Sequence, residues 1–149
     1  MSRPRRRHFV LAAVIIVILL VLLASFRVTV VHGDSMLPTY QNGQTVIVNR
    51  LSRGWNRGDV VLVEAGNEIL IKRIRYLPGD LLPVNESWMF ADVAHFFEPS
   101  DRIEAPLKVP AGHVVVLGDN LKVSDDSRAF GPVPINQIYG RVVNAPPLR

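Results

Sequence analysis

The stretch FVLAAVIIVILLVLLASF, residues 9–26, divides the chain into two parts of different character. It contains 18 residues and no charge. At about 1.5 Å per residue, a helix of this length approaches the roughly 30 Å thickness of the hydrocarbon core of a bilayer. We therefore predict a transmembrane helix over residues 9–26, a basic segment over residues 1–8 and one folded domain over residues 27–149.

A cleaved signal peptide is the alternative interpretation of the apolar run. The small residues Ala24 and Ser25 would suit a cleavage site, and Arg6-Arg7 resembles the basic flank of a twin-arginine export signal. The run is longer than the roughly 7 to 15 apolar residues of a typical signal peptide, which favours an anchor. By the positive-inside tendency, the N-terminus is expected in the cytoplasm and the domain across the membrane.

The folded part of the chain is predicted to be electrically balanced. Of the 17 Lys and Arg residues, four precede residue 8, so that 13 basic and 13 acidic residues lie from Arg27 onward. A nucleic-acid partner is not expected, because such a surface needs clustered basic residues. The absence of cysteine excludes disulfides, a thiolate nucleophile and cysteine zinc sites.

The rest of the chain shows the pattern of a β protein. Short β-branched runs alternate with Gly and Pro, and we predict strands over residues 46–48, 59–65, 68–77, 113–117 and 135–143. This pattern is typical of a small, mostly β domain built as an antiparallel sheet or barrel. Residues 86–106 are rich in aromatic side chains, which suit either the core or the membrane interface.

A serine lies in a turn-forming stretch soon after the apolar run. Residues 33–39 read GDSMLPT, with Ser35 between Gly33 and Pro38. Glycine permits unusual backbone angles and proline fixes φ, so we expect an exposed, rigid turn that presents the Ser35 hydroxyl. The same residue types also build ordinary turns, so the role of Ser35 depends on the rest of the chain.

A serine nucleophile needs a base, and histidine is the usual one. His8 is predicted on the other side of the membrane, His32 lies three residues before Ser35, and no recognisable acid motif accompanies His95 or His113. The G-x-S-x-G elbow is also absent around Ser35, although a triad is a spatial arrangement that sequence does not exclude.

Lys72 is the second candidate base. On a strand over residues 68–77 it shares one face with Leu70, Ile74 and Tyr76, whereas Arg73 points the other way. Burial on an apolar face lowers the pKa of a lysine, so that its neutral amine can accept a proton. The alternative is a lysine that protects a strand edge or extends its amine into water.

Residues 118–131, GDNLKVSDDSRAFG, form a polar loop. Asp119, Asp125 and Asp126 lack the spacing and the closing glutamate of a calcium loop, so no metal site is predicted. An ion pair from Arg128 to Asp126 or to Asp119 is the structural interpretation of these charges.

Taken in order, these stretches resemble the boxes of type I signal peptidases: SMLPT (35–39), RGDVV (57–61), KR (72–73), LPGD (77–80), GDN (118–120), and then Ser124, Asp126, Ser127 and Arg128. The resemblance implies a β catalytic domain around a coiled sheet, with Ser35 as nucleophile and Lys72 as general base. It also implies that Ser124 orients the lysine. The implied supporting residues are Met36, Pro38, Asp119, Asp126 and Arg128.

Two positions depart from the family pattern. Gly33 stands where some members carry a serine whose hydroxyl completes the oxyanion hole, so we expect the hole to use the N–H of Ser35 and a neighbouring backbone group at Gly33. Leu121 stands where an arginine often follows Gly-Asp-Asn, which removes one expected support of that loop.

The resemblance implies a membrane-anchored serine endopeptidase that removes signal peptides from exported preproteins after small residues, without a cofactor. The expected partners are these signal peptides and the lipid bilayer, close to the secretion translocon. The basic N-terminus favours the bacterial plasma membrane, whereas GDNL and FGPV (130–133) also resemble mitochondrial inner-membrane peptidases. A self-cleaving Ser/Lys repressor should instead carry a DNA-binding domain, and a non-enzymatic anchored β module would not explain Ser35 and Lys72.

Overall fold

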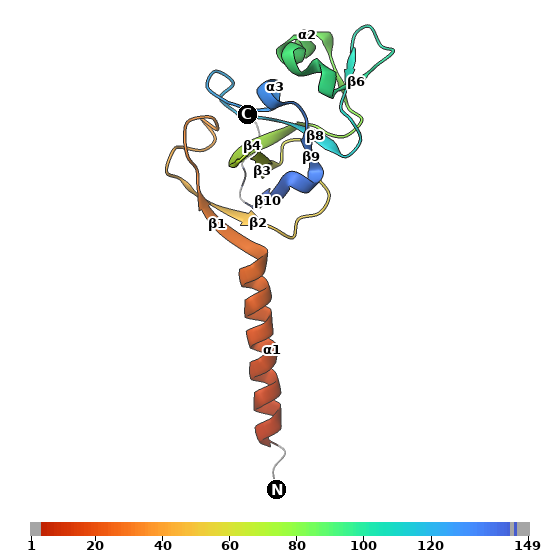
Figure 1. The fold of residues 1–149 in the computed structure, drawn as a ribbon. Helices are drawn as coiled ribbons and strands as arrows, with labels where there is room; N and C mark the ends of the chain where they lie inside the picture. Colours follow the sequence, from red (N-terminus) through yellow and green to blue (C-terminus); the bar gives the residue numbers. More distant parts are fainter. Residues whose placement is uncertain (1–3, 144, 146–149) are drawn as a thin grey trace.

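The structure is a computed structural model that describes residues 4–143 and 145. The helix α1 (Pro4–Ser25) projects as a long rod from a β-rich domain (Figure 1). Its stretch Arg7–Ser25 has a mean hydropathy of 3.0 and is only 6% buried, so it is long and apolar enough to cross a membrane. The helix ends at Ser25, and Phe26, which the sequence placed in the membrane segment, begins the first strand.

The domain is built on one antiparallel sheet, which confirms the prediction of a mostly β fold. In spatial order its strands are β1 (Phe26–Val30), β2 (Thr45–Asn49), β10 (Ile138–Val142), β3 (Val60–Ala65), β4 (Glu68–Tyr76), β8 (His113–Leu117) and β9 (Val133–Pro134). Among the described residues the sheet is open, with β1 and β9 at its edges, and it is not a closed barrel. The predicted last strand starts later than expected, because η2 (Ile135–Gln137) precedes β10.

The hairpin of β3 and β4 sets the position of Lys72 in the sheet. Ala65 pairs with Glu68, which leaves a loop of Gly66 and Asn67 in which Gly66 has a φ of +62°. Two-residue hairpin loops favour glycine because they need positive φ. The resulting register pairs Lys72 with Val61, in a strand flanked by β3 and β8.

A smaller lobe carries the aromatic stretch. It comprises a three-stranded sheet of β5 (Leu81–Leu82), β7 (Leu107–Lys108) and β6 (Glu98–Pro99), with α2 (Val84–Ser87) and η1 (Trp88–Phe96). Phe90 and Phe97 are buried in a core cluster, whereas Trp88 is 71% exposed. Figure 1 places α2 and β6 on the side of the domain away from α1. Burial in the core, one of the two interpretations of this aromatic stretch, therefore holds for Phe90 and Phe97 and not for Trp88.

The serine turn is held by the main core. Met36 and Tyr40, which are 0% and 1% exposed, belong to one cluster with Val46 and Val48 of β2. Burial of side chains of this size contributes roughly 1.5–3 kcal/mol each. The turn that contains Ser35 is therefore tied to the sheet through its neighbours.

Candidate active site

The Ser35 turn is fixed at both ends by hydrogen bonds. The N–H of Val31 donates to Gln44 O at 2.8 Å, and the N–H of Tyr40 donates to Met36 O at 2.9 Å. Between them Gly33 has a φ of +78°, a region that favours glycine. Pro38 lies on the exposed side of the turn, whereas Met36 is its buried anchor.

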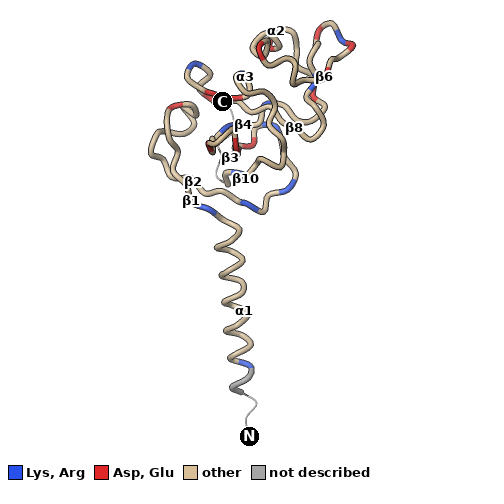
Figure 2. Tube along the Cα trace, viewed as in Figure 1, with Lys and Arg blue, Asp and Glu red and all other residues tan. Residues whose placement is uncertain are grey.

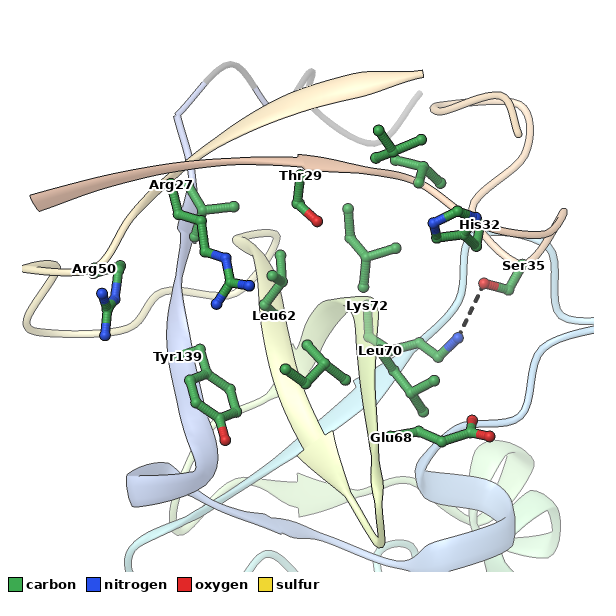
Figure 3. A pocket seen from close by; sticks show the side chains of 15 residues that line it. Arg27, Thr29, His32, Ser35, Arg50, Leu62, Glu68, Leu70, Lys72 and Tyr139 are labelled. Carbon is green, nitrogen blue, oxygen red and sulfur yellow. Dashed lines mark hydrogen bonds between the residues drawn. The ribbon is translucent and has the colours of Figure 1, made fainter. Parts of the chain in front are cut away.

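Lys72 and Ser35 meet although they lie on different elements. The Nζ of Lys72 donates a hydrogen bond of 3.0 Å to Ser35 Oγ, and Lys72 is only 2% exposed (Figure 3). Burial lowers the pKa of Lys72, and the nearby carboxylates of Asp126 and Asp125 only partly oppose that shift. A lysine with a lowered pKa next to a hydroxyl can act as a general base.

The loop after β8 closes over the serine turn. The N–H of Asn120 donates to Ser35 O at 2.9 Å, and its side-chain amide donates to Asp34 O at 3.2 Å. A methyl group at Gly118 would overlap Ser124 Oγ and come within 2.5 Å of Ser35 O. Gly118 therefore permits the close approach of this loop to the serine.

Asp119 lies in a buried ion pair with Arg73. The Arg73 guanidinium donates to both carboxylate oxygens at 2.9 and 2.7 Å, and the two side chains are 3% and 5% exposed. A further bond of 2.8 Å runs from Arg73 to Gly58 O. Asp119 thus pairs with Arg73 and not with Arg128, and the face of β4 that carries Arg73 is also buried.

Sequence reasoning had missed the role of Arg73. It lies beside Lys72 and close in space to the acidic GDN stretch, but strand alternation suggested a residue that points away from the site. A cation next to the base lysine could have been matched to the acidic residue of GDN by charge alone. Asn120 and Gly118 were likewise noted as motif letters without a structural role.

Asp126 is the second buried carboxylate of the site. It is 0% exposed and caps α3 (Ser127–Phe130), accepting hydrogen bonds from Arg128 Nε at 2.8 Å and from the N–H of Gly118 at 3.0 Å. Burial raises the pKa of Asp126, but these hydrogen bonds outweigh it, so that the pKa lies below its ordinary value. Of the two ion pairs that the sequence offered for Arg128, the structure therefore contains the one with Asp126.

The neighbouring serines act on the same loop. Ser127 Oγ accepts the N–H of Val116 at 3.0 Å, which ties α3 to β8. Ser124 lies against Gly118, and its buried Oγ has no hydrogen-bond partner among the described residues. Its predicted contact with Lys72 is not among the hydrogen bonds of residues 4–143, so its role in orienting the lysine stays a prediction.

The backbone donors near Ser35 differ in their availability. The N–H of Gly33 donates to Asn42 Oδ1 at 3.1 Å and is already engaged. Within the described part of the chain the N–H of Ser35 has no such acceptor. The expected oxyanion hole therefore keeps the Ser35 N–H as its candidate donor, and Gly33 contributes its positive φ to the turn.

A cavity of about 450 Å³ opens beside Ser35 and Lys72. It lies between β1 and the first half of β4, and Figure 3 shows His32 next to Ser35 at one end of it. His32 makes no hydrogen bond to Ser35 among the described residues. His113 contacts Ala111 O and the ring of His95 lies tilted against Phe96, and neither histidine lines the cavity.

Two strand edges face this cavity without a partner in the described residues. β1 pairs with β2 on one side, and residues 68–72 of β4 pair with β3, whereas β8 joins β4 from Arg73 onward. Unpaired edges are templates for an extended peptide, whose main chain can add as a further strand. The arrangement therefore suits a peptide that lies across the serine hydroxyl.

Comparison with known proteins identifies related sequences of two kinds. A mitochondrial ATP-independent inner membrane protease subunit 1a of Arabidopsis thaliana is 38% identical over 122 residues, which are 77% of this chain and 67% of that protein. The mitochondrial inner membrane protease subunit 1 of Homo sapiens is 36% identical over 121 residues, which are 77% of this chain and 66% of that protein. The signal peptidase I of Bacillus caldolyticus is 34% identical over 136 residues, which are 76% of this chain and 75% of that protein.

The chain spans about two thirds of the length of these mitochondrial relatives. Residues 5–145 match the family described as signal peptidase, peptidase S26. That match covers the apolar helix, the serine turn, the lysine strand and the loop after β8. The chain therefore belongs to the signal peptidase family, peptidase S26, a family of serine peptidases.

Proposed function

We propose that this chain is a membrane-anchored serine endopeptidase that removes signal peptides from exported preproteins after small residues. Ser35 is its nucleophile and Lys72 its general base. The proposal is carried by one observation, the hydrogen bond of 3.0 Å from Lys72 Nζ to Ser35 Oγ at a lysine that is 2% exposed. Membership of the signal peptidase family supports the choice of substrate.

In the first half of the reaction, Ser35 Oγ attacks the carbonyl carbon of the scissile bond while neutral Lys72 accepts the hydroxyl proton. The negative charge that develops on the carbonyl oxygen is stabilised by the N–H of Ser35. When the tetrahedral intermediate collapses, the C–N bond breaks and Lys72 donates its proton to the leaving amine. The signal peptide stays bound to Ser35 as an ester.

In the second half, a water molecule attacks the ester carbonyl while Lys72 accepts its proton. Collapse of this second intermediate releases the signal peptide as a carboxylic acid and returns the proton to Ser35 Oγ. No cofactor enters either half of this scheme. Asp126 and Arg128 support the loop that covers Lys72, and Asp119 holds it through Arg73.

The membrane anchor determines where the proposed cleavage takes place. Ser35 follows Ser25, the last residue of α1, by ten positions, a span of at most about 36 Å even when fully extended. The cut would therefore fall near the membrane surface, where the apolar part of a signal peptide ends, and near the translocon. The relatives include bacterial and mitochondrial proteins, and we propose the bacterial plasma membrane, with a cytoplasmic N-terminus.

Cleavage of a preprotein by the full chain in detergent tests the proposal. We expect the wild type to cut after a small residue, and Ser35→Ala and Lys72→Met to lose activity while circular dichroism shows an unchanged fold. Ser52→Ala and Lys108→Met, which change the same residue types outside the site, are the matched controls and should remain active.

Two results would contradict parts of the proposal. Full activity of Lys72→Met would exclude the lysine as base, and His32 would be the next candidate because it lines the same cavity. A folded wild type that cuts none of several preproteins would favour a non-enzymatic anchored module.

A further inference from the structure

The end of the cavity remote from Ser35 carries an arginine on the inner face of β1. Arg27 and Thr29 of β1 pair with Val48 and Val46 of β2, and these two valines are buried in the core. Side chains of directly paired residues share one face of a sheet, so Arg27 and Thr29 lie on the face that looks inward. Figure 3 shows both side chains directed into the cavity.

Arg50 lines the same end of the cavity. It follows β2, and its N–H donates to Ser25 O at 2.8 Å, which places it at the junction between α1 and β1. In Figure 3 the guanidinium groups of Arg27 and Arg50 lie on the side of the cavity opposite Ser35. Among residues 4–143 and 145, neither arginine forms an ion pair or a side-chain hydrogen bond.

The charges along the cavity are therefore unevenly distributed. Glu68, the one acidic residue among those that line it, lies below Leu70 on the β4 side and away from the arginines in Figure 3. Tyr139, which is close to Arg27, donates a hydrogen bond of 3.0 Å from its hydroxyl to Glu64 Oε2. Two uncompensated cations thus face the remote end.

The position of these arginines defines a substrate position. Arg27 precedes His32, the neighbour of Ser35, by five residues, which is about 16 Å along a strand at roughly 3.3 Å per residue. A peptide that adds to the edge of β1 with its scissile bond at Ser35 would therefore bring its fifth residue from that bond to Arg27. Since α1 ends beside Arg27 and Arg50, this is the membrane side of the cavity and hence the signal-peptide side.

We propose that Arg27 and Arg50 form a subsite for an acidic side chain located about five residues before the scissile bond. The inference rests on the proposed function, because it takes the peptide bound at Ser35 as given. An aspartate or glutamate at that position would accept hydrogen bonds from one or both guanidinium groups, whose fork geometry suits carboxylates. The subsite would add a charge preference to the selection of small residues next to the bond.

An anionic lipid headgroup is the competing occupant, because basic segments at the start of β1 lie next to the uncharged length of α1 (Figure 2). The orientation of Arg27 favours a peptide over a lipid headgroup as the occupant. Arg27 lies on the inner face of β1, whereas Phe26 and Val28 occupy the outer face and are 41% and 65% exposed.

Paired peptide substrates test the subsite with the full chain in uncharged detergent micelles. The two peptides of a pair differ at one position, four to seven residues before the scissile bond, where one carries Asp and the other Lys. They are otherwise identical. For the wild type at low ionic strength, we expect kcat/KM to favour Asp at position five or six. Each exposed arginine should contribute about two- to fivefold, and added salt should weaken the preference.

Arg27→Gln and Arg50→Gln should each reduce the Asp/Lys ratio, the double variant should abolish it, and Arg27→Glu should reverse it. Arg53→Gln, which removes an exposed cation that does not line the cavity, is the matched control and should keep the ratio. The subsite proposal would be overturned if the ratio of kcat/KM between the Asp and the Lys peptide were the same at all four positions. It would also be overturned if the preference for Asp survived in the double variant. Neither result would contradict the peptidase activity itself.

Cleavage measured in anionic vesicles distinguishes binding of a lipid headgroup from binding of an acidic peptide side chain. If the arginine variants lose activity on every peptide equally, and only when anionic lipid is present, the arginines serve a headgroup and the subsite is overturned. If the folded wild type cuts none of the peptides, the proposed function itself fails, which is a different result from a lost preference.

Discussion

The backbone carbonyl of Ser35 accepts a hydrogen bond of 2.9 Å from the N–H of Asn120, so the proposed nucleophile is held by a loop that is distant from it in the sequence. The Asn120 side chain adds a bond of 3.2 Å to Asp34 O. These two contacts fix the backbone on which the Ser35 hydroxyl stands. The hydroxyl itself remains free to meet Lys72 and a substrate.

Asn120→Ala should therefore slow the chemistry without weakening substrate binding. The variant keeps the backbone bond to Ser35 and loses the amide bond to Asp34, which is worth about 0.5–1.5 kcal/mol, so kcat should fall by up to about tenfold. We expect KM to stay close to that of the wild type, because Asn120 does not line the cavity. Steady-state cleavage measures both constants, with Asn56→Ala as control. A rise in KM with unchanged kcat would contradict a positioning role.

Gly118→Ala should be more damaging. The added methyl group would meet Ser124 Oγ and the carbonyl of Ser35, and a backbone carbonyl cannot move aside as a flexible side chain can. We expect a loss of about 1–3 kcal/mol in the free energy of unfolding, together with most of the activity. Thermal unfolding and cleavage rates measure the two effects.

A double variant separates the two clashes. Gly118→Ala combined with Ser124→Gly removes the contact with the hydroxyl but leaves the contact with Ser35 O, so stability should recover only in part, relative to Ser124→Gly alone. Wild-type stability and activity in Gly118→Ala would show that the loop does not need this close approach.

The sequence predicted the strands and suggested Ser35 and Lys72 as the reacting pair for different physical reasons. Strands β3, β4 and β8 are β-branched runs between turn residues, and their local patterns suffice. β1 was missed because Phe26 continues the apolar run, so that hydropathy alone does not show where the helix ends and the strand begins. Ser35 and Lys72 were identified from motif letters, while their hydrogen bond depends on the register of β4 and on the turn after β1.

The partners of the acidic residues were less predictable. Strand alternation placed Arg73 on the face of β4 opposite Lys72, but both faces of β4 are covered at that level, since Ile71 and Ile74 belong to two different core clusters. An arginine there needs a buried partner, and Asp119 provides it. Sequence spacing alone left Asp119 and Asp126 equivalent as partners for Arg128.

The lowered pKa of Lys72 predicts a pH dependence of activity. In the proposed mechanism the neutral amine is the base, so kcat/KM should rise with pH through the pKa of folded Lys72, which lies below the ordinary value of 10.5 because of burial. Initial rates across the pH range, on a peptide without ionisable groups near the bond, measure this rise. A midpoint at the ordinary pKa of lysine, or a flat profile, would contradict a buried base.

The free energy of unfolding should also depend on the ionisation of Lys72. Between the folded pKa and 10.5 the unfolded chain binds the proton that the folded chain has released, so the contribution of Lys72 to the free energy of unfolding increases with pH. Below the folded pKa the amine is charged while buried, and the cost is greatest. Lys72→Met should therefore be most stabilised relative to wild type at low pH, and the difference should narrow as the pH rises. Chemical unfolding at several pH values measures this difference.

The buried pair of Arg73 and Asp119 provides the last prediction. Removal of one partner leaves the other charge buried, so Arg73→Met and Asp119→Leu should each lower the free energy of unfolding by about 3–5 kcal/mol. The double variant should recover much of that loss, because no unpaired charge remains. Arg57→Gln, which breaks a surface pair whose arginine is 63% exposed, should cost only about 0.2–1 kcal/mol and is the matched control.

Activity distinguishes a purely structural pair from one that also positions the site. Asp119 directly precedes Asn120, whose N–H holds Ser35 O, so the stable double variant should still cleave with a lowered kcat because its loop has lost the ionic tether to β4. Unfolding in denaturant and steady-state cleavage, made on the same preparations, give both quantities. If Arg73→Met costs no more stability than Arg57→Gln, the pair is not buried in solution. If the double variant keeps the wild-type kcat, the pair stabilises the fold without positioning Ser35.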